Sequence, residues 1–489
     1  MTITQAEAQR KPTSVPTDES IGTDQTRRSW WVLIVALIAQ LLVVIDISVV
    51  NTALPTIGKG LHMHGDDLQW LVTAYLLMSG GGLLLGGRIA DLLPRRRMFL
   101  IGLATFTLGS LMSALAGTAG TLIAARAGQG LGAAIMTPAA LSIIMTTYEG
   151  AQRAKGLALW GAVGSVGIAA GVLAGGALTT WGGWQLIFWI NVPLGVIAFA
   201  AVCLLVPAGT TTSTTLRQFD VPGAVAVVGG LAALLLAIQG AGTHGWASAY
   251  TISLLGIALV LFVGFRFIEQ RAERPLVAPH TWRITSLVAG TGIMLAVTGV
   301  LVGAIFLTSI FLQSVLGYSP LKTGAAFLPL AVIMTVAAHA AGQMLRHLAP
   351  RTVAASGFAI TAAGALLLAT ASKTSQYATG LLPGLLMLGL GAGLVFVAVS
   401  VSAMSGIPGQ HAGMASGFLM TGHEVGAALG VAVVSAVAAT AGSLTTSAAA
   451  QGFSRGLLAA AVVAGAAALA AIATMPKVRG EVTGGMHMH

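Results

Sequence analysis

The chain has 489 residues, of which 56% are hydrophobic and only 8% are charged, and its mean hydropathy is +0.89. A water-soluble protein of this length cannot bury so much apolar surface, so the composition indicates a polytopic membrane protein. The net charge of +10 does not indicate nucleic-acid binding, because the charges lie between apolar runs, where basic loops orient a membrane protein. A single cysteine, Cys203, excludes a disulfide framework and a cysteine metal site.

Apolar runs follow one another along almost the whole chain. Residues 1–28 are polar and contain no apolar h-region, so we expect a disordered cytoplasmic tail and not a cleaved signal peptide. A spanning helix needs about 20 apolar residues, and fourteen runs meet this requirement. The runs are Trp30–Val50, Gln69–Gly87, Arg97–Ala116, Thr121–Met145, Gly156–Thr179, Gln185–Val206, Val221–Gln239, Tyr250–Phe267, Ser286–Val315, Leu321–Leu345, Thr352–Thr370, Tyr377–Ser400, His411–Thr440 and Gly456–Thr474.

Basic residues decide the orientation of these runs. Fourteen spans place both termini on the same side of the membrane. If that side is the cytoplasm, the cytoplasmic segments hold 19 of the 24 Lys and Arg, and the outer loops hold only Lys59, Lys322, Lys373 and Arg455. This asymmetry supports the span count and predicts that both termini lie in the cytoplasm. The high Gly and Ala content suggests a bacterial source, so we expect a multi-pass protein of the bacterial cytoplasmic membrane.

The runs divide into two halves. Gly342–Arg351 repeats the pattern of Gly87–Arg97 at the equivalent place but lacks the Asp, which is the weak internal repeat expected of two parallel six-helix halves. We therefore predict an all-α fold with two six-helix bundles and two inserted helices. The predicted units are a tail (1–28), an N-terminal bundle (29–207), two inserted helices with a cytoplasmic connection (208–284), a C-terminal bundle (285–475) and a cytoplasmic tail (476–489).

The loop Gly87–Arg97 reads Gly-Arg-Ile-Ala-Asp-Leu-Leu-Pro-Arg-Arg-Arg and joins two membrane-length runs. An Asp–Arg cluster at a helix end can hold a helix junction in one arrangement and release it in another. The loop resembles the signature between helices two and three of the major facilitator superfamily, although Leu92 replaces the usual basic residue and Pro94 the usual Gly. The resemblance implies a cytoplasmic gate, and the matching residues are Gly87, Asp91, Arg95 and Arg96.

Two charges lie within the spans of the first half. An acid such as Asp46 costs about 3 kcal/mol in a span, so it must face a cavity or a partner, or take up a proton. At about 1.5 Å per residue, Asp46 and Arg126 lie at similar depth, within about 10 Å of the outer boundary. A nearby Arg favours the carboxylate and apolar burial favours the neutral acid, so a change of access could load and unload a proton. The alternative is a static pair that sets helix packing.

A second acid, Glu424, follows His423 near mid-depth in the thirteenth run. Glu424 could take a proton or neutralise a cationic substrate, and His423 could tune it or share its proton. The alternative is a pair that only fixes the helix. In the fifth run, Gly167, Gly171 and Gly175 recur every four residues, which predicts a flat stripe for close helix contact and no more than ordinary packing.

Several of these segments together resemble the fourteen-span drug:proton antiporter family. The matching segments and residues are Asp46 with Asn51, Ala53, Leu54 and Pro55; Trp70–Tyr75; Arg126 with Gln129 and Gly130; Gly171 with Gly175 and Gly176; and Ile187–Gly195. Val172 departs from the helix-five pattern, which usually has Pro there. The resemblance implies proton-driven export of amphipathic drugs or antibiotics by alternating access. We expect Asp46, Arg126 and Glu424 to couple protons, and His423, Asn51 and Gln129 to tune the proton or substrate site.

The sequence bears on the energy source of transport and on the alternative functions. It has no phosphate-binding Gly-x-x-x-x-Gly-Lys-Ser/Thr loop, so we expect an ion gradient or the substrate gradient to drive transport. We expect no cofactor and no metal, and as partners a small amphipathic substrate, protons and the lipid bilayer, with the chain acting as a monomer. A same-fold transporter of one endogenous metabolite, exported or imported, remains open. A lipid-modifying enzyme would need a clustered nucleophile and base, and a passive channel would not need the latch-like loop.

Overall fold

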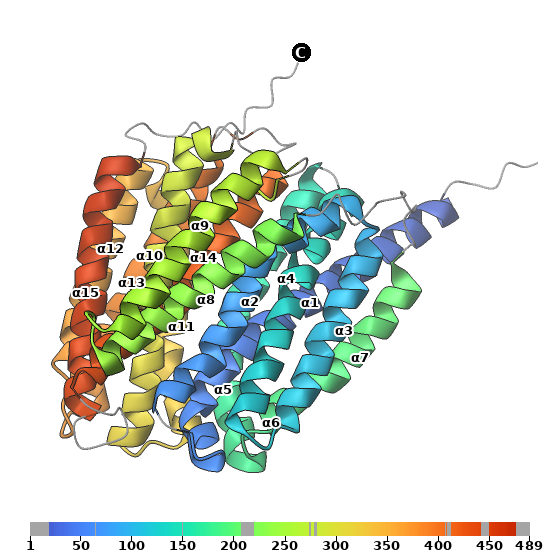
Figure 1. The fold of residues 1–489 in the computed structure, drawn as a ribbon. Coiled ribbons are helices and arrows are strands. Elements are labelled where there is room, and N and C mark those ends of the chain that lie inside the picture. The colour runs from blue at the N-terminus through green and yellow to red at the C-terminus, as the bar shows by residue number, and fades with distance from the viewer. Residues whose placement is uncertain are drawn as a thin grey trace, which may run out of the picture.

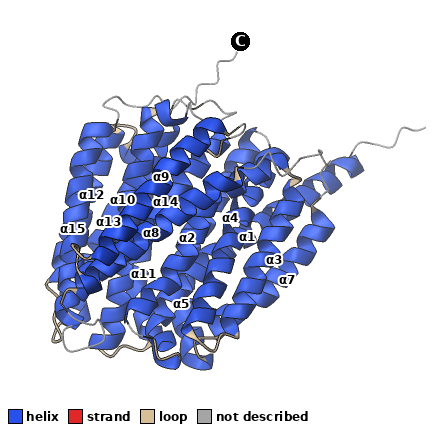
Figure 2. Ribbon diagram, in the orientation of Figure 1, coloured by secondary structure: helices blue, strands red, loops and turns tan. Residues whose placement is uncertain are grey.

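The computed structural model is helical throughout the part of the chain that it describes (Figure 2). The described residues are 19–63, 65–148, 150–206, 220–272, 275–277, 281–405, 407, 412–441 and 449–475. Helices are the expected solution for a chain in lipid, because each helix satisfies its own backbone hydrogen bonds.

The first half of the chain forms seven helical segments. These are α1 (Glu19–Gly60), α2 (Gly65–Leu92), α3 (Arg95–Ala114), α4 (Ala119–Thr147), α5 (Gly150–Gly182), α6 (Leu186–Trp189) and α7 (Asn191–Leu205). The short α6 and α7 together make one predicted span. Pro193 lies in the first turn of α7 and has no N–H to donate to the carbonyl of Trp189, so the hydrogen bonding is interrupted there, while Ile190 between the two segments keeps helical dihedrals (φ −63°, ψ −30°).

The rest of the chain forms a helical hairpin and a second set of helices. The hairpin is α8 (Val221–His244) and α9 (Ala249–Arg271). The second set is η2 (Thr281–Arg283), α10 (Thr285–Ile310), η3 (Phe311–Val315), α11 (Pro320–Met344), α12 (Pro350–Ala369), η4 (Tyr377–Leu381), α13 (Leu382–Met404), α14 (Ala412–Ala439) and α15 (Ala449–Thr474). The segments η3 and η4 are π-helical turns that continue into α10 and α13.

Helices α1–α7 pack mainly on one another and make the first bundle, and α10–α15 make the second bundle (Figure 1). The hairpin crosses the face where the bundles meet, with α8 against both α2 and α14 (Figure 1). Small residues permit this contact: a Cβ atom placed on Gly242 of α8 would lie 2.8 Å from the carbonyl oxygen of Ala436 in α14.

Twelve segments of the described chain are long and apolar enough to cross a membrane. The sequence predicted fourteen. The two predicted runs outside these twelve correspond to α2 and α5, which are helices of 28 and 33 residues. The predicted disordered tail also differs from the structure, because α1 begins at Glu19 and not at Trp30. Residues 1–18 and the predicted C-terminal tail lie outside the described residues. The prediction of an all-α polytopic membrane protein is confirmed.

The two bundles touch closely at the end of the molecule where α5 ends and α11 begins. A Cβ atom placed on Gly176 of α5 would lie 2.6 Å from the carbonyl oxygen of Pro320. One placed on Gly324 of α11 would lie 2.5 Å from the carbonyl oxygen of Val172. The reciprocal glycines bring the two backbones into contact, so the bundles are closed against each other at this end.

Candidate functional site

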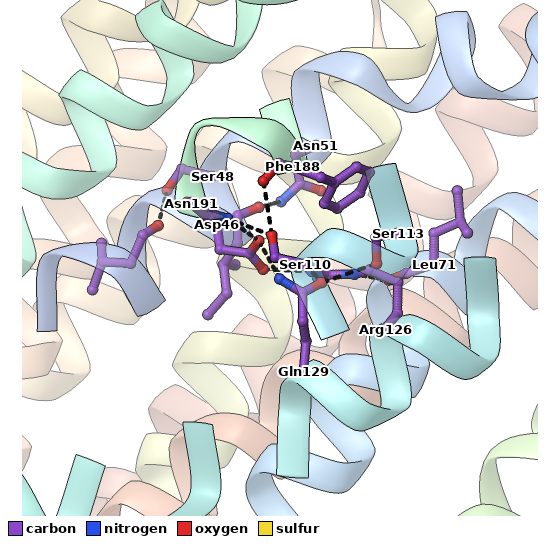
Figure 3. Close-up of polar contacts among 12 residues, drawn as sticks. Asp46, Ser48, Asn51, Leu71, Ser110, Ser113, Arg126, Gln129, Phe188 and Asn191 are labelled. Carbon is purple, nitrogen blue, oxygen red and sulfur yellow. Dashed lines mark hydrogen bonds and ion pairs between the residues drawn. The ribbon is translucent and has the colours of Figure 1, made fainter. Parts of the chain in front are cut away.

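Asp46 lies on α1 in the middle of the first bundle, and only 2% of its surface is exposed. Its carboxylate pairs through Oδ2 with Nη1 of Arg126 on α4 (Figure 3). Arg126 is also buried, with 1% of its surface exposed. Sequence depth placed these two residues at the same level, and the structure brings them together. Each charge is excluded from solvent, so each depends on the other for stabilisation.

Arg126 is held from several sides besides the carboxylate. Its Nε donates to the Leu71 carbonyl at 3.0 Å, and its Nη1 donates to Gln129 Oε1 at 2.9 Å (Figure 3). The guanidinium lies over the Tyr75 ring, 4.4 Å from the ring centroid, and 5.8 Å from that of Phe188. A planar guanidinium suits this combination of stacking and directed hydrogen bonds better than an ammonium group would.

Two amides complete the shell around the carboxylate. Nε2 of Gln129, on α4, donates to Asp46 Oδ1 at 2.9 Å. Nδ2 of Asn191, the first residue of α7, donates to the same oxygen at 3.0 Å and to Ser110 Oγ on α3 at 3.1 Å (Figure 3). Asp46 therefore receives three donors from two other helices, α4 and α7.

Asn191 and Ser110 were not predicted as site residues. Asn191 appeared only within the motif Ile187–Gly195, although an amide inside an apolar run needs a polar partner and could have been singled out. Ser110 carried no such signal, because a serine in a helix can bond to its own backbone. In the structure its hydroxyl donates to the Phe188 carbonyl at 3.0 Å, which ties α3 to α6 beside the ion pair.

Asn51 was predicted as a tuning residue, but its side chain does not join this cluster. Its Nδ2 donates to the Ile47 carbonyl at 3.0 Å, within α1. The Asn51 backbone carbonyl instead accepts a bond from the second bundle, from Ser309 Oγ at 2.6 Å.

The second predicted acid lies on a different surface. Glu424 of α14 is 8% exposed and packs on Gly80 of α2, at the seam between the bundles. His423 Nδ1 is 3.5 Å from Glu424 Oε1, and its ring lies 5.9 Å from that of Phe396. Among the described residues, Glu424 pairs with His423 and packs on Gly80, and forms no hydrogen bond or ion pair with Asp46 or Arg126, so the two acids do not share one cluster.

The predicted gate residues lie at the α2–α3 junction. Arg96 Nη2 donates to the Cys203 carbonyl, near the end of α7, at 2.6 Å, whereas the Arg95 side chain is exposed. Beyond the backbone of its own helix, no described atom of the chain lies within 4 Å of the place where a Cβ on Gly87 would stand. The side chain of Asp91 lies outside the described part of the structure, so its predicted pairing is not seen.

The glycine stripe of α5 lies against the helix that carries Asp46. A Cβ atom placed on Gly171 would lie 2.7 Å from Ser48 Cβ and 3.2 Å from the backbone of Ile45. Gly175 lies against Val49 and the Thr52 hydroxyl, and Gly167 against Val44. These glycines therefore set how closely α5 approaches α1 on both sides of Asp46.

No group of three or more His, Cys, Asp or Glu in the described residues could hold a metal ion. What the structure shows at this site is a pair of opposite charges, Asp46 and Arg126, held together across α1 and α4.

Comparison with known proteins identifies a family whose members are similar in sequence to this chain. The model of the Major Facilitator Superfamily matches residues 36–431. The puromycin resistance protein pur8 of Streptomyces alboniger is 38% identical over 438 residues, which cover 88% of this chain and 86% of that protein. The cephamycin export protein CmcT of Amycolatopsis lactamdurans is 36% identical over 84% of this chain and 85% of its own length.

Solved structures agree on the fold. The human organic anion transporter MFSD10 superposes with a TM-score of 0.60 at 16% identity, covering 91% of this chain and 99% of that one. An auto-inhibited peptide transporter of the POT family superposes with a TM-score of 0.63 at 17% identity, covering 92% and 96%. At this level of identity the likeness concerns the fold alone.

Proposed function

Because the chain belongs to the Major Facilitator Superfamily and is a transporter and not an enzyme, we propose that it exports amphipathic drugs or antibiotics in exchange for protons. The relatives named for antibiotic resistance and export support the substrate class. The buried Asp46–Arg126 pair is the observation that carries the coupling, because an acidic side chain inside a membrane span is costly and typically marks an ion or proton pathway.

We propose that α2 and α5 are spans as well, which brings the number to fourteen. At about 1.5 Å per residue the two helices are roughly 42 and 50 Å long, more than the hydrocarbon core needs. Both termini then face the same side, and the distribution of Lys and Arg favours the cytoplasm of a bacterial inner membrane. In this arrangement the bundles are 29–207 and 285–475, the segment 208–284 carries the inserted hairpin, and a monomer contains the whole transport path.

We propose that a proton adds to Asp46 and ends its ionic attraction to Arg126. The guanidinium keeps its hydrogen bonds to the Leu71 and Gln129 carbonyls and its contact with the Tyr75 ring. These contacts are what would hold the buried guanidinium while Asp46 is neutral. The neutral carboxyl needs an acceptor for its O–H, and Asn191 Oδ1 is buried and has no hydrogen-bond partner among the residues that the structure describes. Rotation of that amide would supply the acceptor, so the same shell can serve both protonation states.

Glu424 takes the second role in this proposal. Its Oε2 is buried and finds no hydrogen-bond partner in the described part of the chain, and the residue lies at the seam where the bundles must move against each other. A carboxyl at that place is suited to bind a second proton or to attract a cationic substrate, with His423 as its neighbour.

The first test is drug-induced proton movement in vesicles that contain the purified protein. Addition of a cationic dye or a neutral antibiotic should release protons from a loaded lumen, and Asp46→Asn should abolish the signal while the protein stays folded. Ser48→Ala is the matched control, because Ser48 lies two residues away on α1 and bonds only within its own helix, to the Val44 carbonyl at 2.8 Å. Proton movement by Asp46→Asn equal to that of the unmodified chain would remove Asp46 from the mechanism.

We propose that the α2–α3 junction is the cytoplasmic gate and that Arg96 contributes more to it than Arg95. Arg96 holds the end of α7 through the Cys203 carbonyl, and a charged hydrogen bond of this kind is worth about 1.5–3 kcal/mol. Arg96→Ala should therefore lower drug export by about tenfold, and Arg95→Ala, at an exposed neighbour, should lower it much less. Equal effects in a drug-accumulation assay would contradict this assignment.

A further inference from the structure

Pro55 leaves a gap in the hydrogen bonding of α1. Proline has no backbone N–H, so it cannot donate to the carbonyl four residues earlier, that of Asn51. Asn51 is only 5% exposed, and a buried carbonyl without a donor is costly. The helix therefore presents one acceptor that its own backbone does not satisfy.

The missing donor comes from the opposite bundle. Ser309 of α10 is fully buried, and its Oγ donates to the Asn51 carbonyl at 2.6 Å. One turn later Gln313 donates through Nε2 to the carbonyl of Thr52 at 2.9 Å and to Ser309 Oγ at 3.3 Å. Ser309 and Gln313 of the second bundle thus donate hydrogen bonds to two consecutive backbone carbonyls of α1 in the first bundle.

Local structure places Gln313 for this contact. It lies in η3, the π-helical turn that ends α10, and such turns are frequent at functional sites. The first residue of the turn, Phe311, stacks on Phe453 of α15 with ring centroids 4.2 Å apart. The turn is therefore anchored inside the second bundle, and its contact with α1 transmits the position of that bundle.

The contact lies close to Asp46 along the same helix. Asn51 is five residues after Asp46, which is about 7.5 Å along the axis. It also lies at the end of the molecule where Gly176 and Gly324 bring α5 and α11 together. Any motion that opens this end must break the two hydrogen bonds or carry α1 with the second bundle.

We propose that Ser309 and Gln313 are positioning residues of the transport cycle, which hold the proline-freed carbonyl of the Asp46 helix while this end is closed and release it when the end opens. The proposal rests on the proposed alternating-access transport but does not depend on which ion drives it. It also gives Pro55 a function, since the N–H that Pro55 lacks leaves free the carbonyl that the second bundle binds.

Distances between spin labels across the closed end test the proposal. The labels are attached at Lys59→Cys and Lys322→Cys, which are exposed positions on α1 and α11, in a Cys203→Ser background reconstituted in lipid nanodiscs. Ser309→Ala and Gln313→Met should each raise the ratio of long to short distances about fivefold, the effect of one lost hydrogen bond. Thr298→Val is the matched control, because the Thr298 hydroxyl is also buried in α10 but bonds within its helix, to the Met294 carbonyl at 2.8 Å.

Pro55→Ala distinguishes loss of the hydrogen bond between Ser309 and the Asn51 carbonyl from a general loss of packing between the bundles. An N–H at position 55 can bond to the Asn51 carbonyl within α1, so this variant should shift the distances in the same direction as Ser309→Ala. The double variant should shift them no further than either single variant, because both act on one carbonyl. Unchanged distances in folded Ser309→Ala, or a double effect equal to the sum of the single effects, would overturn the proposal. Because distances are read without a proton gradient, failure of proton coupling would leave this result intact.

Discussion

The energetics around Asp46 are those of a buried ion pair. Two charges taken out of water are stabilised only while each has its partner and its hydrogen bonds, and here Asp46 receives three donors while Arg126 has the Leu71 carbonyl and the Tyr75 ring. Such a pair adds little net stability compared with an apolar pair of the same shape. Its retention in the centre of a membrane bundle is better explained by the proton exchange proposed above.

Removal of the Arg126 charge alone should be more harmful to stability than removal of both charges of the pair. Arg126→Leu leaves Asp46 buried without an opposite charge, at a cost of about 3–5 kcal/mol. The double variant Asp46→Asn with Arg126→Leu leaves no uncompensated charge and should recover most of the thermal stability in detergent. Export should remain absent in both variants. A double variant that unfolds at the same temperature as Arg126→Leu would show that packing, and not charge, dominates this site.

Helix α5 shows how one element serves both the site and the contact between bundles. Gly167, Gly171 and Gly175 face α1, whereas the next residue, Gly176, faces α11 of the other bundle. A single helix with small residues on two faces can therefore pass the position of α11 to the helix that carries Asp46. Val172, where the antiporter pattern usually has Pro, contributes its carbonyl to the Gly324 contact.

The α5 stripe yields a graded prediction. Gly175→Ala places a Cβ against the Thr52 hydroxyl and 2.8 Å from Val49 Cα, so it should cost about 1–3 kcal/mol and lower the melting temperature in detergent. Gly164→Ala is the control on the same helix, because the nearest atom to its Cβ would be Gln40 Nε2 at 3.6 Å, an ordinary contact distance. Equal melting temperatures for the two variants would contradict close α1–α5 packing at Gly175.

The whole molecule is two bundles closed at one end, with a hairpin across their seam. Helix α8 touches both α2 and α14, so it spans the line along which Glu424 of one bundle meets Gly80 of the other (Figure 1). The outer helix of this hairpin, α9, exposes most of its large side chains, as a helix that faces lipid is expected to do.

The proposed topology can be tested with reporter fusions. Fourteen spans with the N-terminus in the cytoplasm place the C-terminus inside and the loop around Lys373, between α12 and η4, outside. A fluorescent protein fused at the C-terminus should therefore fold and fluoresce, and alkaline phosphatase inserted beside Lys373 should be active. Inactive phosphatase at that loop, with the fusion protein inserted in the membrane, would rule out the orientation. Phosphatase inserted beside Thr118, between α3 and α4, tests the span count, because this loop lies outside with fourteen spans and inside if α2 and α5 do not cross.

The amino-acid sequence by itself determined the membrane class, the family and the pairing of Asp46 with Arg126. These depend on local properties: the length of apolar runs, a few short motifs and the depth of rare charges along helices of known rise. The span count reached by the same reasoning stays a prediction for α2 and α5. The interruption of hydrogen bonding between α6 and α7 is also a local effect of Pro193. The motif that contains Pro193 was identified from the sequence, but this interruption was not predicted.

Only the tertiary structure decided which helix faces meet. Asn191 bonds to Asp46, Ser309 finds the carbonyl that Pro55 frees, and Glu424 packs on Gly80 instead of joining the Asp46 cluster. The physical reason is that runs so uniformly rich in Ala, Gly, Leu and Val present nearly equivalent faces, so the rotation of each helix about its axis is not encoded in its own pattern. That rotation is set by backbone contacts at glycines and by a few polar side chains on helices far apart in the chain.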